Sequence, residues 1–491
     1  MNLMQEENGQ DKRKNHPKRN EILLAWFLIL SLFIGSLLLA FGLNITPLLL
    51  VGLAGGLIFA YRYTYFSFYL ALFLLPFLGI AVTIPTGNLI FSERAFGGSI
   101  DIFLGELIIL FVLAAWAIKV LVLWLKRRDI GWQPKLPLWK YYSGLVAAHL
   151  ISAFSSFGPD PILVLKFVLR PVIFCYMAFV ALPVNLIRSR RRLKAALGVL
   201  TAVGCIAAVN GLISLVLVPA AGSIIRSQPI ALFGTNPIGE NHNVLAELLL
   251  ATGPIALALA TMVKKQATRR VLFALAAVQS LVALLTFART AWIVFFLQIV
   301  FMLATEWRAA VKKHIAALFA LALLLLPLAI LQVSFSFSTT AQSSNLTRWM
   351  LTDIAYQAFL EQPLIGSGAG TFILRVGNAQ IFYQEFGDPL DAHGFIQKLA
   401  VETGLVGLLA YAIFLIGGML LVRRQLDQLK GNSRLAGFAL TAGAGGAIAY
   451  QFLNTAYWSA HMWLPIGMML AGLAVLQSSE ESEAENTFAP V

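Results

Sequence analysis

Apolar segments about as long as a lipid bilayer is thick follow one another along most of the chain. Backbone polar groups in hydrocarbon must be paired inside the protein, so segments of this length fold as helices. We therefore predict an all-α polytopic membrane protein with about 12 to 14 transmembrane helices and one long extracytoplasmic loop that contains helices. The fourteen candidate spans are residues 22–42, 45–61, 64–84, 102–125, 140–156, 162–187, 194–219, 243–263, 271–287, 290–304, 315–333, 395–422, 435–453 and 461–477.

The composition agrees with a membrane protein and excludes other classes. Hydrophobic residues make up 59% of the chain and charged residues 12%, well outside the soluble globular range. The net charge of +13 arises from short basic clusters between apolar spans, so we predict no nucleic-acid partner. The two cysteines, Cys175 and Cys205, each lie in an apolar run, where a small buried side chain is expected rather than a disulfide.

The basic clusters set the orientation. With the amino terminus in the cytoplasm, every cluster falls on the cytoplasmic side, as the positive-inside rule requires. The clusters are at residues 62, 126–128, 188–192, 264–270, 308–313 and 423–424. The same register places the weakly charged connections on the outer face of the cytoplasmic membrane, namely residues 85–101, 157–161, 220–242, 288–290, 334–394 and 454–460.

The predicted spans and loops divide the chain into five parts. These are a basic cytoplasmic tail (1–21), about eleven spans (22–333), a large extracytoplasmic loop with catalytic elements (334–394), about three spans (395–477) and an acidic cytoplasmic tail (478–491). In the loop, an apolar helical pattern follows Ser344 and Asn345, which predicts an amphipathic helix on the membrane surface. No P-loop or dinucleotide fingerprint is present, so an outward-facing enzyme must use an already activated substrate, such as a lipid-linked diphosphate.

His393 is the leading candidate for a catalytic base. It directly precedes the predicted span 395–422, at the outer water interface, and Asp391 lies two residues before it. A histidine can act as a base near neutral pH because its ordinary pKa is about 6.5. The alternative is an interfacial histidine that only hydrogen-bonds the loop, and His242 and His461 on the outer side compete for the role of the base.

Arginines are the candidates for binding phosphate. Arg289 is the one charge in the apolar stretch 281–302 and lies where two short spans turn, so it either grips phosphate with two parallel hydrogen bonds or snorkels to lipid headgroups. Arg348 and Arg375 lie in the large loop. Arg170 lies in the outer half of its span, where it either adds positive charge to the same site or packs between helices.

A glycine-rich turn, Pro363-Leu-Ile-Gly366-Ser-Gly368-Ala-Gly370, follows the predicted amphipathic helix. Such a turn can present backbone N–H groups to an anion, although most turns of this kind are only tight turns. Two further motifs are Asn241-His242-Asn243, which opens the eighth span, and Gly404, which follows His393 after ten residues.

The order of these motifs resembles the O-antigen ligase and O-antigen polymerase superfamily of bacterial membrane glycosyltransferases, mainly over residues 230–420. The resemblance rests on Thr286-Phe-Ala-Arg289, Arg348-Trp349, the 363–370 turn, Asn241-His242 and the spacing of His393 and Gly404. It implies His393 and Arg289 as catalytic residues, Arg348, Arg170 and Arg375 as diphosphate-binding residues, and Asn241, His242, Gly366, Gly368, Asp391 and Gly404 as supporting residues.

The resemblance also implies a reaction in lipopolysaccharide or other envelope polysaccharide synthesis that needs neither a metal ion nor a cofactor. A glycan leaves undecaprenyl diphosphate and joins an acceptor hydroxyl at the outer face of the cytoplasmic membrane. The acceptor is a lipid A core sugar for a ligase, or a lipid-linked repeat unit of O-antigen, capsule or exopolysaccharide for a polymerase. A transporter or flippase of lipid-linked sugars would share the span count, but we find no internal repeat of the kind that transporters show.

Overall fold

The structure is a computed structural model. It describes residues 46–77, 81–85, 99–126, 134–156, 168–218, 225–231, 235–239, 241–313, 339–380, 390–454 and 460–488, together with isolated positions between 320 and 337 and at 382 and 384. The chain divides into two compact units, one of residues 1–68 and 108–130 and one of residues 69–107 and 131–491. The predicted span 22–42 and most of 315–333 lie outside the described residues.

The smaller unit contains helix α3 (Thr46–Arg62), the start of α4 (Thr64–Leu74) and most of α5 (Leu104–Leu125). Lys119 on α5 donates a hydrogen bond of 2.6 Å to Thr64 Oγ1 and lies 5.0 Å from the ring centre of Tyr61. These contacts give the single lysine of a mainly apolar helix a polar partner and an aromatic face.

The larger unit begins with the rest of α4, and then comes a two-stranded antiparallel sheet that the sequence analysis did not predict. Residues 64–84 were expected to form one span, but α4 ends at Leu74, and β1 (Ala81–Pro85) pairs with β2 (Ser99–Phe103). Ala81 is opposite Phe103 and Pro85 is opposite Ser99. Polar and apolar residues alternate in Ser-Ile-Asp-Ile-Phe, a period that fits a strand and not a helix.

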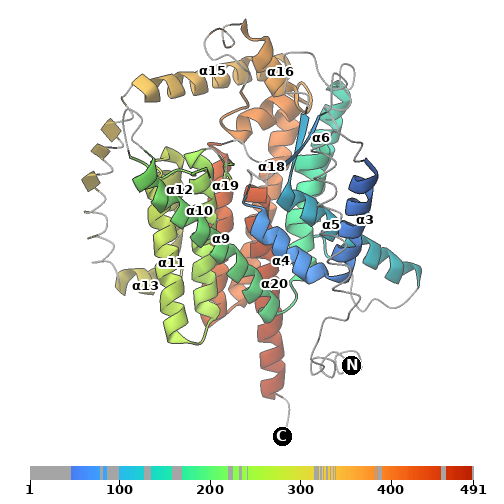
Figure 1. The fold of residues 1–491 in the computed structure, drawn as a ribbon, viewed down its shortest axis with the longest axis vertical. Coiled ribbons are helices and arrows are strands. Elements are labelled where there is room, and N and C mark those ends of the chain that lie inside the picture. Colours follow the sequence, from blue (N-terminus) through green and yellow to red (C-terminus); the bar gives the residue numbers. More distant parts are fainter. Residues whose placement is uncertain are drawn as a thin grey trace. The chain divides into compact units, whose positions relative to one another are not determined.

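Helices make up nearly all the rest of the larger unit (Figure 1). In chain order they are α6 (Trp139–Ser156), the π-helical turns η2 (Leu169–Phe174) and η3 (Tyr176–Ala181), α8 (Leu182–Leu186), α9 (Arg190–Leu217), α10 (His242–Met262), α11 (Gln266–Leu285), α12 (Arg289–Leu303), α13 (Arg308–Lys313), α15 (Thr339–Glu361), α16 (Thr371–Asn378), α18 (Phe395–Gln428), α19 (Gly431–Gln451) and α20 (Ala460–Phe488).

Seven helices in the described part of the chain are long and apolar enough to cross a membrane, or eight if the bent pair α3 and α4 forms one span. The prediction of an all-α polytopic membrane protein is therefore confirmed. The predicted spans 271–287 and 290–304 correspond to α11 and α12, and the helix predicted in the large loop is α15, which begins at Thr339.

Helices α9, α10, α11, α12 and α19 share one apolar core, with α10 buried along most of its length. A polar side chain joins three of them. Gln298 on α12 donates hydrogen bonds to the carbonyl of Leu250 on α10 at 3.0 Å and to that of Ala442 on α19 at 3.1 Å. A Cβ at Gly446 would lie 2.2 Å from Gln298 Nε2, so α19 needs glycine there to admit this amide. Interhelical amide bonds of this kind hold membrane helices in register.

Candidate active site

The turn between α11 and α12 presents Arg289. The Thr286 hydroxyl donates to the Ala283 carbonyl at 2.6 Å and accepts from the Ala288 N–H at 3.2 Å. One side chain therefore pairs with a backbone carbonyl before the turn and a backbone N–H after it. Phe287 has φ of 55°, a left-handed conformation that costs energy in a residue other than glycine. This tight turn makes Arg289 the first residue of α12, which is the position that the sequence predicted for it.

Arg348 lies beside Arg289. The Arg289 guanidinium donates a hydrogen bond of 2.8 Å to the Asn345 side chain, which joins α12 to α15 one turn before Arg348. Arg348 is partly buried, and its Nε is buried without a hydrogen-bond partner. Burial lowers the pKa of Arg348, and the positive charge of Arg289 lowers it further. A half-buried guanidinium beside a second positive charge is costly until an anion neutralises it.

The loop that carries His393 is fixed on both sides. Ala392 is buried in a core formed by α15, α16 and the first turns of α18, which includes Leu351 and Phe372. Asp391 accepts the Ala392 N–H at 2.9 Å and two hydrogen bonds from Lys398 Nζ, at 3.0 and 2.7 Å. Lys398 is fully buried, so breaking this ion pair would leave a buried charge. His393 therefore has a defined position.

The electrostatic environment keeps His393 neutral. Burial lowers the pKa of His393 from its ordinary 6.5, the charge of Arg348 lowers it further, and Asp391 acts in the opposite direction. A histidine with a lowered pKa is unprotonated at neutral pH and can accept a proton. Arg348, 45 positions earlier in the chain, is thus close enough to His393 to act on it electrostatically.

The glycine-rich turn packs against a break in α18. Gly366 has φ of 72° and Gly404 has φ of 61°, both in the left-handed region. A Cβ at Gly404 would lie 2.5 Å from the carbonyl carbon of Leu364, so the two backbones are in direct contact. The Ser367 and Gly368 N–H groups donate to carbonyls of α18 at 2.8 and 3.1 Å.

The group that this turn faces is a side chain of the protein. The buried Glu402 side chain interacts with the backbone N–H groups of Gly370 and Phe372, and Lys398 Nζ lies 3.8 Å from one of its oxygens. The turn thus packs against the helix that follows the His393 loop. We do not propose that its backbone N–H groups bind a substrate phosphate.

The amino terminus of α10 contributes to the same site. The Asn241 side chain caps the helix by accepting the Asn243 N–H at 2.9 Å. Tyr450 on α19 donates its hydroxyl proton to the Asn243 carbonyl at 2.9 Å and also interacts electrostatically with Arg348. The charges of Arg348 and Arg226 both act on the His242 ring.

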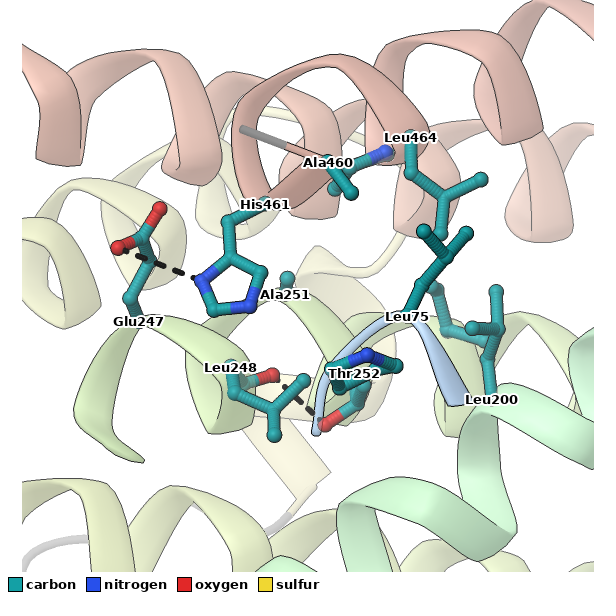
Figure 2. A pocket seen from close by; sticks show the side chains of 12 residues that line it. Leu75, Leu200, Glu247, Leu248, Ala251, Thr252, Ala460, His461 and Leu464 are labelled. Atoms are coloured by element: carbon teal, nitrogen blue, oxygen red, sulfur yellow. Dashed lines mark hydrogen bonds and ion pairs between the residues drawn. The ribbon is translucent and has the colours of Figure 1, made fainter. Parts of the chain in front are cut away.

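His461 lies in a different environment from His393. Its Nδ1 is 3.8 Å from a carboxylate oxygen of Glu247, which also accepts a hydrogen bond from Gln451. Figure 2 shows the ring in a pocket whose other walls are mainly apolar side chains from α9, α10 and α20. No direct contact that the structure describes joins His461 to Arg289, Arg348 or His393, although Glu247 and Arg348 both act electrostatically on Tyr450.

The remaining predicted arginines are paired with carboxylates. Arg170 forms an ion pair of 2.7 Å with Glu106 and lies over the Phe103 ring at 5.6 Å. Arg375 forms an ion pair of 2.7 Å with Glu361. Their charges are balanced within the chain, so neither is carried into the site proposed below.

Comparison with known proteins identifies the region that carries this geometry. A family model described as O-antigen ligase matches residues 272–412. Residues 272–412 are an O-antigen ligase domain. The predicted resemblance is therefore confirmed for this region, and the apolar helices make the chain a membrane protein. No curated protein matches the chain.

The O-antigen ligase domain contains Arg289, Arg348 and His393, whereas other residues at the site come from outside it. Arg226 and Tyr450 were not predicted. Arg226 is the single charge between residues 219 and 239, in a connection predicted to face outward, so the reasoning that selected Arg289 would also have found it. Tyr450 carries no such signal, because its role depends on the packing of α19 against α10.

Proposed function

We propose that the protein transfers a glycan from undecaprenyl diphosphate to an acceptor hydroxyl, as an O-antigen ligase, at the outer face of the bacterial cytoplasmic membrane. The observation that carries the proposal is the pair of arginines, Arg289 and Arg348, beside a neutral His393. In the described part of the chain, neither arginine is paired with a carboxylate. The O-antigen ligase domain, which spans all three residues, supports the same chemistry.

The residues divide the reaction between them. Arg289 and Arg348 bind the diphosphate, and their charges stabilise the negative charge that grows on it as it leaves. His393 accepts the hydroxyl proton while the acceptor oxygen bonds to the anomeric carbon and the carbon–oxygen bond to the phosphate breaks. The arginines supply the positive charge that assists departure of the leaving group. A polymerase would use the same steps, with a lipid-linked repeat unit as acceptor in place of a lipid A core sugar.

Arg289→Lys tests the assignment of Arg289. Lysine keeps the charge but cannot make two parallel hydrogen bonds to one phosphate, so we expect transfer to fall at least about tenfold. Transfer is measured with purified full-length protein, lipid-linked glycan and lipid A core acceptor, at matched protein abundance. A residue that only snorkels would tolerate lysine, and a near-normal rate would remove Arg289 from the site. Lipid-linked repeat units as acceptor separate polymerase from ligase activity in the same assay.

Cysteine labelling tests the proposed orientation. Gln357 is exposed on α15, and Ser189 is exposed just before α9. In a Cys205→Ala background, we expect a membrane-impermeant maleimide to label Gln357→Cys in intact spheroplasts and Ser189→Cys only after lysis. Cys175 is buried and serves as the unlabelled reference. Labelling of Gln357→Cys only after lysis would place the site on the cytoplasmic side and exclude the proposed reaction.

A further inference from the structure

The first turn of α18 is bonded to the segments on both sides of it. Lys398 Nζ donates to both oxygens of Asp391, at 3.0 and 2.7 Å. A second carboxylate, that of Glu402 one turn further along α18, lies 3.8 Å from the same nitrogen. The preceding residue, Gln397, donates to the Thr352 hydroxyl of α15 at 2.8 Å. Consecutive residues of α18 therefore hold the loop before this helix and the helix α15 beside it.

These two contacts lead to the two sides of the candidate site. The Thr352 hydroxyl donates to the Arg348 carbonyl at 2.7 Å, so Gln397 reaches the turn of α15 that carries Arg348. Lys398 reaches the loop that carries His393, which follows Asp391 by two residues. The first turn of α18 thus fixes the proposed base and one proposed diphosphate-binding arginine relative to each other.

The ion pair of Lys398 with Asp391 occupies the carboxylate completely. The Lys398 side chain has no exposed surface, and that of Asp391 is 20% exposed. Besides the lysine, Asp391 Oδ1 accepts the N–H of Ala392 at 2.9 Å. No hydrogen bond that the structure describes joins this carboxylate to the His393 ring. The carboxylate nearest to the base in sequence is therefore directed at a lysine.

The charges that face His393 come from two elements. Arg348 on α15 lowers the pKa of the ring, as burial does, and Asp391 in its own loop raises it. Lys398 on α18 carries a charge opposite to that of Asp391 and so opposes its effect. A histidine that paired with a carboxylate lacking this lysine would keep its proton to a higher pH, where it could not accept a proton from a hydroxyl.

We propose that Lys398 is a positioning residue of the transfer reaction, which engages both oxygens of Asp391 and leaves the His393 ring without a carboxylate partner when it accepts the hydroxyl proton. This inference rests on the proposed function. Lys398 acts through Asp391 and touches neither substrate. Loss of the lysine and loss of the aspartate should therefore have opposite effects on His393, which mere support of the fold would not produce.

The test compares the acid limb, the fall in transfer rate as His393 becomes protonated, among variants of the purified full-length protein. The donor is lipid-linked glycan and the acceptor is a lipid A core. In Lys398→Gln the Asp391 charge is no longer neutralised, so the acid limb should move up by about one pH unit. In Asp391→Asn the carboxylate that raises the pKa of His393 is gone, so the limb should move down. The double variant has neither charge and should return close to the wild-type position.

A second measurement does not depend on transfer. The His393 ring is titrated by NMR in protein that contains isotope-labelled histidine, and His393→Ala identifies its signal. In each variant the midpoint of this titration should move in the same direction as the acid limb. Lys264→Gln removes an exposed lysine between α10 and α11 and should change neither measurement.

A lysine that only supports the fold would lower the rate and leave both midpoints in place. Any result for Lys398→Gln other than upward movement overturns the inference. If that variant does not fold, Asp391→Asn decides, because it leaves Lys398 beside Glu402, and midpoints that stay or rise overturn the inference. Wild-type protein that transfers no glycan contradicts the proposed function, while the ring titration still tests Lys398.

Discussion

Substitution of His393 by alanine is expected to lower the rate of glycan transfer by about 10²- to 10⁴-fold, the usual effect of removing a general base. Donor binding should remain near normal, because Arg289 and Arg348 are unchanged and the loop is anchored through Asp391 and Lys398. Cells with this variant should accumulate unused lipid-linked glycan. The measurements are single-turnover transfer and donor binding by purified protein.

A pH profile separates a base from a structural histidine. Burial and the charge of Arg348 lower the pKa of His393 below 6.5, so the wild-type rate should be constant at neutral pH and fall as the pH drops through that pKa. The rate falls at low pH because the protonated ring cannot accept a further proton. The residual activity of His393→Ala should lack this acid limb. His16→Ala, in the amino-terminal tail, is the control, and near-normal transfer by His393→Ala would move the search to His242 or His461.

Substitution of Arg348 by glutamine should reduce transfer by about 10²- to 10³-fold, because it removes a partly buried charge that faces the leaving group. It should also move the acid limb of the pH profile to higher pH. The charge of Arg348 lowers the pKa of His393, so its loss lets that pKa rise. Two independent readouts therefore report on one substitution.

Arg270→Gln controls for the loss of a positive charge away from the site. If Arg348→Gln reduced transfer without moving the acid limb, Arg348 and His393 would not share a site in the working enzyme. If it moved the limb without reducing transfer, Arg348 would lie near the base but would not bind the diphosphate.

The sequence was sufficient to predict the fold class. It was also sufficient to select candidate residues that are unusual for their position in the chain. Arg289 interrupts an apolar stretch, and His393 stands at the start of a span, so each was visible without tertiary contacts. The pairing of Arg170 with Glu106 was not visible, because it joins residues 64 positions apart. The same holds for the glycine-rich turn, which packs against Glu402 on a helix that follows it.

A short alternating segment was the source of an error in the predicted spans. Residues 81–85 are apolar enough to continue a span when hydropathy is averaged over a long window, yet they form a strand with residues 99–103. A window long enough to detect a membrane helix averages out a period of two residues over five positions.

The break at Gly404 determines where α18 enters the lipid. A helix of 34 residues would be about 51 Å long, far more than the hydrocarbon layer requires. Residues 405–428 alone would measure about 36 Å, which is enough to cross that layer. The stretch 395–404 does not continue that line, because the Phe395 ring lies 4.7 Å from the ring of Tyr411, sixteen residues further along. The break therefore folds the start of α18 back beside its own span, and a Cβ at Gly394 would lie 2.9 Å from the carbonyl oxygen of Phe452 at the end of α19. On that geometry the donor would meet the proposed base His393 at the rim of the helices and need not lift its diphosphate far from the bilayer.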